Sequence, residues 1–447
     1  MDLSFPERDQ RLNESSTPPP EEHIDLRCVW GIEFYTPAYA DRLESGLLQL
    51  GWGASGADGL KRDPIAWLRG LARRRYSGGW LNLGVLTTDH SPPFFMSHHV
   101  PTLPQSAEYA QAQISAISPS LVALTVCFAV REEFSDSIDD ILREPRSSYT
   151  TPIPRGSRIH DPYSQKVEAL EELRHTLRSD VADWFAEFVP GVLSSGDRHV
   201  PTWELVTANL GHPVVPGESE RPPLWSYLEA IGFTLGLDSW AFGDPASLYL
   251  STDQSRDHAL LIGNTDTLEK TLRSGTENPR NRVVFEVNEQ LLEIIPLWGL
   301  IPLVDQYTQD TINATVPGDG RPEQTLDVLT ESMRRRTDLP FIASELVDLS
   351  EEEQGVWARA DSFTRVRHSP SRPAEKLGEV LRFVSGNQGV WLKAADRAAR
   401  DNLVQYGTLL ASAENVRLQG RIKLLTYAVV GLAILTVLAQ IAAATWW

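Results

Sequence analysis

The sequence predicts an α/β or α+β domain followed by a mainly helical region, a stalk helix and one C-terminal transmembrane helix. Strand-like and amphipathic helical segments alternate over residues 24–200, helical patterning dominates after residue 283, and the last 24 residues carry no charge. A chain of 447 residues is also too long for one ordinary core, which predicts two or three domains.

Composition indicates a globular chain and excludes one class of binding partner. The chain is 41% hydrophobic and 23% charged, and its 60 acidic against 41 basic residues give a net charge of -19. Nucleic-acid binding needs clustered Lys and Arg, so we expect no nucleic-acid partner. Cys28 and Cys127 each lie in a strand-like segment without the paired spacing of a metal or redox site, which predicts two buried, reduced thiols.

The first domain is predicted to begin after a disordered lead. Residues 1–23 are polar and contain three consecutive prolines, which is the composition of a disordered segment. The α/β domain, 24–200, is predicted from strands with a period of two and helices with a period near four. The strands are Leu26–Thr36, Trp80–Thr87 and Leu121–Val130, and the helices are Pro37–Leu50 and Tyr163–Phe188.

The second domain, 201–364, is predicted to be mixed at first and then mainly helical. Two short apolar runs, Ser247–Leu250 and Ala259–Ile262, fit a hairpin, and charged amphipathic helices are expected over 324–360. The apolar patch at 291–304 fits a second membrane segment or a buried core. We favour the core, because flanking acidic residues leave only 11 consecutive uncharged residues.

A Ser/Pro/Arg-rich linker at 365–373 leads into a predicted stalk helix at 374–423. The stalk segment has no proline, and Leu403, Tyr406, Leu410, Ala413 and Val416 form one stripe. Gly386 and Gly389 are candidates for an interruption of this helix. The stripe needs a partner surface, either on the globular body or on another copy of the chain.

The segment 424–447 is predicted to span a membrane. From Leu424 onward, 24 uncharged residues reach roughly 36 Å as a helix, enough to cross a hydrocarbon core of about 30 Å. Trp446 and Trp447 suit the far membrane interface, where indole rings are favoured.

Charges next to the span predict its orientation. Arg417, Arg421 and Lys423 precede the span and no charge follows it, so the positive-inside rule places the N-terminal side in the cytoplasm. We therefore expect a single-pass, tail-anchored protein of the cell membrane, with its soluble body in the cytoplasm. The lipid bilayer is its first expected partner.

Motifs that signal a particular chemistry are absent from the sequence. It contains no GxxxxGK[ST], HExxH, CxxC or GxSxG pattern, which favours a protein that is not an enzyme. No motif indicates a particular cofactor, so the cofactor is unknown. The nearest candidate is the loop that holds Asp89, His90, His98 and His99, side chains able to hold a transition metal or to supply a general base. A solvated surface loop is the simpler interpretation.

A second candidate lies around His160 and Asp161, which follow a basic stretch. This stretch contains Arg143, Arg146, Arg155 and Arg158, which could attract an anion or an acidic partner. A solvated loop is again the simpler interpretation.

The segment Asn415–Ile441 (NVRLQGRIKLLTYAVVGLAILTVLAQI) resembles the junction of stalk and first membrane helix in CorA-type magnesium transporters. The shared features are a charged helix, a basic residue and Leu425-Thr426 at the membrane entrance. That family carries a Gly-Met-Asn signature and a second span, and this sequence contains neither. The resemblance therefore implies an oligomerising stalk on a membrane anchor and carries no cation transport with it.

These patterns favour a membrane-anchored cytoplasmic binding or interaction protein of unknown ligand, with a protein partner or self-association through its stalk and membrane helix. One alternative is a degenerate CorA-like cation channel or pore-forming membrane effector. In that case Thr436 and Gln440, four residues apart on one helix face, would line the pore. Another alternative is a membrane-bound, metal-dependent hydrolase that uses the His-rich loop.

Overall fold

The computed structural model describes most of the chain. The described residues are 5–52, 63–71, 79–88, 97–99, 102–118, 120–154, 156–195, 199–209, 226–233, 239–243, 248–252, 257–271, 279–315, 339–351, 357–366 and 374–445. The chain forms two compact units, one of Met1–Gln306 with Phe341–Val390 and the other of Tyr307–Pro340 with Trp391–Trp447.

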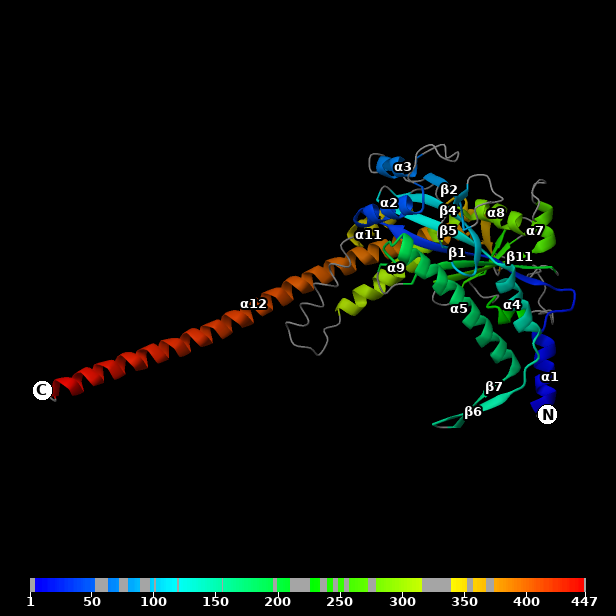
Figure 1. The fold of residues 1–447 in the computed structure, drawn as a ribbon. Coiled ribbons are helices and arrows are strands. Elements are labelled where there is room, and N and C mark those ends of the chain that lie inside the picture. Colours follow the sequence, from blue (N-terminus) through cyan, green and yellow to red (C-terminus); the bar gives the residue numbers. More distant parts are fainter. Residues whose placement is uncertain are drawn as a thin grey trace. The chain divides into compact units, whose positions relative to one another are not determined.

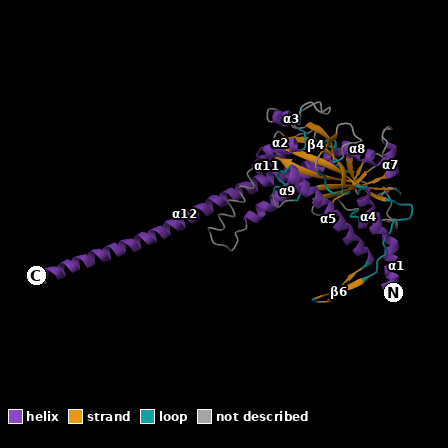
Figure 2. Ribbon diagram, in the orientation of Figure 1, coloured by secondary structure: helices purple, strands orange, loops and turns teal. Residues whose placement is uncertain are grey.

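Within the described residues, the first unit contains a mixed sheet of ten strands, in the order β12-β9-β10-β11-β8-β1-β5-β4-β2-β3. Figure 2 draws the strands in orange. Neighbouring strands are antiparallel except for two parallel pairs, β8 with β11 and β2 with β3. The strands are β1 Ile24–Tyr35, β2 Gly79–Thr87, β3 Ser97–His99, β4 Ala107–Ser118, β5 Leu121–Val130, β8 Thr202–Ala208, β9 Trp240–Phe242, β10 Leu248–Thr252, β11 His258–Asn264 and β12 Phe363–Arg365. A sheet domain with helices agrees with the predicted α/β class.

Helices surround this sheet (Figure 1). Those of the first unit are α1 Phe5–Ser16, η1 Pro37–Tyr39, α2 Ala40–Gln49, α3 Pro64–Leu71, α4 Glu132–Arg143, α5 Pro162–Phe188, α6 Ser226–Ala230, α7 Thr265–Thr271, α8 Pro279–Leu291 and η3 Ala360–Ser362. Residues of both units contribute to α9 Ile294–Thr315, α11 Leu339–Glu351 and α12 Leu377–Thr445. A separate hairpin consists of β6 Tyr149–Ile153 and β7 Gly156–His160.

Strand β1 lies in the middle of the sheet and every one of its residues is buried. Its Trp30 is opposite Cys127 of β5 on one side and Trp203 of β8 on the other. Because β8 hydrogen-bonds to β1, the sheet continues across the predicted boundary at residue 200. The later strands β9 to β12 belong to the same sheet, so both predicted ranges, 24–200 and 201–364, contribute strands to it.

Most strand predictions are confirmed. Strands β1, β2 and β5 match the predicted segments, and β10 and β11 form the expected antiparallel hairpin, with Leu250 opposite Leu261. Strand β4 was not predicted from the sequence AEYAQAQISAIS, although nearly all its residues are buried. Residues 110–116 alternate polar and apolar side chains, but the apolar ones are mostly alanine, which is a poor strand former, so the strand signal is weak.

Helices cover both faces of the sheet, as two consecutive residues of β1 show. Because strand side chains alternate between faces, Trp30 and Gly31 face opposite sides. Trp30 Nε1 donates a 2.8 Å hydrogen bond to Asn288 Oδ1 of α8. A Cβ on Gly31 would lie 2.6 Å from Val181 Cγ1 of α5. The sheet is therefore the middle layer between α5 and α8.

The apolar patch at 291–304 forms buried core, as predicted. It includes Ile294, Leu297 and Leu300, all at most 1% exposed. Within the described residues, no single helix has both the length and the apolar character to cross a membrane. Arg280–Leu291 and Ile294–Thr308 have them only when taken together, and a 67° bend separates the two.

The N-terminal residues differ from the predicted disordered lead of 1–23, because Phe5–Ser16 form α1. Polar contacts hold this helix in place. Asn13 Nδ2 donates to Arg146 O at 2.7 Å, and Ser148 N donates to Asp9 Oδ2 at 2.8 Å. A segment held by polar contacts has no apolar pattern, so its composition alone suggests disorder.

The predicted stalk and membrane segments, 374–423 and 424–447, share one helix of 69 residues, α12, described up to Thr445. The predicted interruption at Gly386 and Gly389 is wrong, because the helix continues through both. These glycines instead permit close packing on α11. A Cβ on Gly386 would lie 2.7 Å from Ser350 Oγ. In the predicted linker 365–373, residues 367–373 lie outside the described part.

Candidate functional site

The predicted His-rich site falls mostly outside the described residues. Asp89 and His90 lie outside them, and the side chains of His98 and His99 in β3 are not described. Among the residues that the structure describes, no group of three or more His, Cys, Asp or Glu side chains is placed to hold a metal ion. The metal site and the hydrolase stay predictions.

The predicted membrane residues are placed in part. Arg417, Arg421, Lys423, Leu424, Thr436 and Gln440 all belong to α12. The side chains of Arg421, Lys423 and Leu424 are exposed, whereas those of Arg417, Thr436 and Gln440 are not described. Trp446 and Trp447 lie outside the described residues.

The basic stretch before α5 has structural contacts. Asp161 is the N-cap of α5 and accepts a 2.8 Å hydrogen bond from Ser164 N. The His160 ring stacks on Tyr149 with centroids 4.6 Å apart. Arg143 Nε donates to Asp139 Oδ2 at 2.6 Å. Arg146 and Arg158 likewise pair with Glu144 and Glu168, and Arg155 lies outside the described residues. The described residues of the predicted anion site therefore serve in helix capping and local ion pairing.

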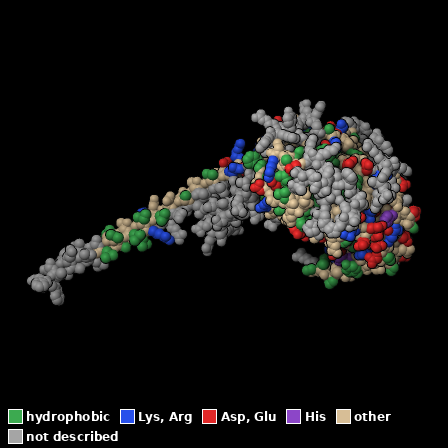
Figure 3. Space-filling view, turned by 45° about the horizontal axis from the view of Figure 1, so that its top comes forward, with side chains coloured by type: hydrophobic (Ala, Val, Ile, Leu, Met, Phe, Trp, Pro, Cys, Tyr) green, Lys and Arg blue, Asp and Glu red, His purple; other side chains and the backbone are tan. Residues whose placement is uncertain are grey.

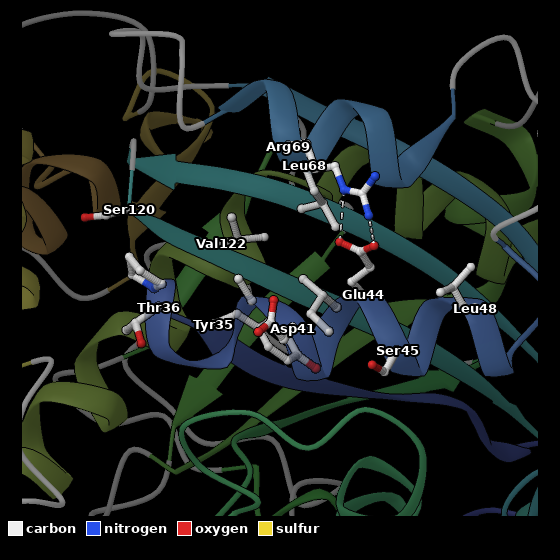
Figure 4. Close-up of a pocket in the computed structure, with 13 residues that line it drawn as sticks. Tyr35, Thr36, Asp41, Glu44, Ser45, Leu48, Leu68, Arg69, Ser120 and Val122 are labelled. Carbon is white, nitrogen blue, oxygen red and sulfur yellow. Dashed lines mark hydrogen bonds and ion pairs between the residues drawn. The ribbon is translucent and has the colours of Figure 1, made fainter.

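A pocket of about 590 Å³ lies between α2 and α3, beside the end of β1 and the start of β5 (Figure 4). This volume is within the range of small-molecule pockets, roughly 300–1,000 Å³. The pocket is lined by Tyr35, Thr36, Pro37, Ala40, Asp41, Leu43, Glu44, Ser45, Leu48, Leu68, Arg69, Ser120 and Val122. Residues from five elements, β1, η1, α2, α3 and β5, meet there, and sequence reasoning did not predict the pocket.

Packing of α2 sets one wall of this pocket. Pro37 begins η1, and α2 follows with Leu43 and Leu47 buried against the body. A Cβ on Gly46 would lie 2.6 Å from Val189 Cγ1 and even closer to Phe188 O, so α2 rests directly on the backbone at the end of α5. The opposite side of α2 is left to line the pocket.

Charges of both signs line the pocket. The Arg69 guanidinium on α3 pairs with the Glu44 carboxylate on α2 through two hydrogen bonds, and its Nε lies 3.2 Å from Glu44 Oε2 (Figure 4). Asp41, one turn before Glu44, adds a second carboxylate. The lining side chains therefore carry two negative charges against one positive charge.

The deep end of the pocket combines apolar and polar groups. Tyr35 OH donates a 2.5 Å hydrogen bond to Val189 O, and burial raises the pKa of its phenol well above the ordinary value. Thr36 Oγ1 is buried and has no hydrogen-bond partner among the described residues. Leu68 and Val122 provide apolar wall. This arrangement suits a ligand that has an apolar body, a cationic end and a hydrogen-bonding group.

The sequence contained only a weak signal for this pocket. Asp41 and Glu44 are three residues apart on a helix, a spacing typical of an ordinary solvated face. The exposed Leu48, on the same side one turn later, departs from that pattern. Arg69 comes from a separate helix, so no spacing rule connects it to Glu44.

No protein-family model, curated protein or solved structure matches the chain. The likeness of Asn415–Ile441 to CorA-type transporters stays a prediction from those residues.

Proposed function

We propose that the protein is a membrane-anchored binding protein. In this proposal the C-terminal part of α12 lies in the bilayer, and the pocket of the first unit binds a ligand. The exposed apolar surface of α12 is the observation that carries the anchor. Its members are Leu424, Leu425, Tyr427, Val429, Val430 and Leu432, each 50–74% exposed.

The distribution of these six residues supports insertion into lipid. Successive helix residues are about 100° apart, so the six positions surround the helix axis. Figure 3 shows hydrophobic side chains along this part of α12. Soluble proteins rarely expose such a continuous apolar surface, whereas a bilayer covers it from all sides. The exposed Arg421 and Lys423 support an orientation with the first unit in the cytoplasm.

Two arginines inside the uncharged segment are expected to release the chain from membranes. Each charged residue near the centre of a membrane helix costs about 2.5–3.5 kcal/mol. The full chain should stay in the membrane pellet after alkaline carbonate extraction, whereas the Ile434→Arg/Val437→Arg variant should move to the supernatant. The matched control, Gln405→Arg/Ser412→Arg, adds the same charges to exposed positions of the same helix and should stay in the pellet. Wild-type chain in the supernatant would contradict the anchor.

For the binding function, we infer that the α2–α3 pocket takes a cationic group on an apolar body. One net negative charge, apolar walls and the buried Thr36 hydroxyl support this ligand class. The ion pair between Glu44 and Arg69 is exposed on the Arg69 side, and exposed pairs contribute little, about 0–1 kcal/mol. A ligand cation can therefore replace Arg69 at Glu44 at small cost.

Three probes of equal length test this ligand class in the detergent-solubilised chain. Hexylammonium should give saturation-transfer NMR signals, hexanol weaker signals, and hexanoate none, because only the first complements the carboxylates. Asp41→Asn/Glu44→Gln should weaken hexylammonium binding by roughly tenfold. The control Glu187→Gln, an exposed carboxylate on α5, should leave it unchanged. Equal binding of hexylammonium and hexanoate would refute the assignment.

A further inference from the structure

A regular seam runs along α12 in the second unit. Starting at Val404, side chains recur at alternating spacings of four and three residues, which is the heptad repeat of a coiled coil. The seam consists of Val404, Thr408, Ala411, Asn415, Leu418, Ile422, Leu425, Val429 and Leu432. These positions span four heptads, and sustained repeats of three to four heptads are typical of coiled coils.

Every one of these nine side chains is exposed in the single chain. Leu418 is the least exposed of the large ones at 47%, and Val404 and Leu432 are 66% exposed. The seam differs from the stripe predicted through Leu403, Tyr406 and Leu410, which lies on another side of the helix. Seven of the nine seam residues are apolar, so water is a poor environment for this face.

The kinds of residue in the seam select one assembly. In heptad notation, the C-terminal half of the seam has Ile422 and Val429 at a positions and Leu418, Leu425 and Leu432 at d positions. The N-terminal half has Thr408 at a, and Val404 and Ala411 at d. β-branched residues at a with leucine at d favour two parallel strands. Asn415 occupies the a position before Ile422, where a single asparagine fixes register and dimeric state.

Charges set the upstream limit of the seam. The same spacing continues upstream through Ala394, Arg397 and Asp401, all of them exposed. In a parallel, in-register pair, Arg397 would face Arg397 and Asp401 would face Asp401 of the other copy, and like charges repel, so the seam begins at Val404. The flanking e positions, Gln405, Ser412, Gln419 and Thr426, are uncharged, so they create no like-charge pairs across the interface.

We propose that two copies of this chain associate as a parallel, in-register coiled coil through the seam Val404–Leu432. The partner is thus a second copy of the chain, which goes beyond the membrane anchor and the pocket. A parallel pair also directs both uncharged segments toward the same side, as a common membrane requires. The upper part of the seam, Val404–Leu418, precedes the uncharged segment, so pairing there does not depend on lipid.

Mass and disulfide trapping test the proposal on the full chain in mild detergent. Light scattering should give twice the chain mass of 49.8 kDa, and Leu418→Glu/Ile422→Glu should reduce it to one chain mass. The control Gln405→Glu/Ser412→Glu adds the same charge beside the seam and should remain dimeric. Circular dichroism should show the same helix content in all three proteins, which separates lost pairing from lost folding.

Engineered cysteines distinguish the parallel arrangement. Leu418→Cys should form an intermolecular disulfide on mild oxidation, because identical d positions face each other only in a parallel, in-register pair. Val416→Cys, whose cysteine lies outside the seam, should form at least tenfold less of the intermolecular disulfide. A single chain mass for the wild type, or a dimer in which Leu418→Cys does not cross-link, would overturn the proposal. Neither result bears on carbonate extraction, so the anchor is tested separately.

Discussion

Replacing Glu204 with alanine should lower the free energy of unfolding of the first unit by about 3–5 kcal/mol, the usual cost of removing one partner from a buried ion pair. Glu204 on β8 is 1% exposed, and both carboxylate oxygens are bound by arginines of α5. Arg174 Nε lies 2.5 Å from Oε2 and Arg178 Nε lies 2.9 Å from Oε1. The alanine variant leaves two largely buried guanidinium groups without this partner.

Chemical denaturation monitored by tryptophan fluorescence measures this loss. The control Glu172→Ala removes an exposed carboxylate of α5 and should change stability by at most about 0.5 kcal/mol. Burial alone would raise the pKa of Glu204, but Arg174 and Arg178 lower it below the ordinary 4.5. The ionised carboxylate therefore contributes to the free energy of unfolding above pH 4.5, and this contribution decreases at lower pH. The difference in free energy of unfolding between wild type and variant should accordingly become smaller in acid. A gap that is the same at all pH values would contradict an ionic origin.

Replacing Gly46 with alanine should also destabilise the first unit, by about 1–3 kcal/mol. Within an exposed helix this substitution normally stabilises by up to about 1 kcal/mol, because glycine is a poor helix former. At Gly46 the added Cβ meets the backbone carbonyl of Phe188 and the side chain of Val189. A backbone atom cannot move to another rotamer, so α2 itself must shift.

The matched control lies on the facing helix of the pocket. Gly70 of α3 has open space where a Cβ would be added, so Gly70→Ala should stabilise the first unit by about 0.5–1 kcal/mol. Because α2 carries Asp41 and Glu44, Gly46→Ala should also weaken hexylammonium binding, and Gly70→Ala should not. Thermal unfolding and the NMR titration measure both effects. Stabilisation by Gly46→Ala would show that α2 does not rest on α5.

Much of the sheet follows from the sequence, since strands β1, β2 and β5 contain clear alternation or continuous apolar runs. Their pairing does not follow, because the local pattern contains no information about distant neighbours. Strand β8 is an example: it lies beside β1 although the two are far apart in the chain. This distance explains why a domain boundary was placed between them.

The candidate sites follow less directly from the sequence than the strands do. The pocket depends on Glu44 and Arg69 meeting across two helices, which no spacing could indicate. The seam of α12 is periodic in the sequence itself, but several helix faces contain apolar residues. The seam was chosen because its side chains, such as Val404 and Leu418, are described and exposed. The side chains of the stripe through Leu403 and Leu410 lie outside the described part, so exposure does not compare the two faces.

The strand order also has a consequence for biosynthesis. β1 ends at Tyr35, but its neighbour β8 begins only at Thr202, and the edge strand β12 begins at Phe363. During translation, β1 therefore emerges long before one of its two neighbours exists. Non-local pairing of this kind slows folding and leaves an apolar strand edge exposed to aggregation. The ribosome-bound chain should need chaperone protection until nearly all of the first unit has been synthesised.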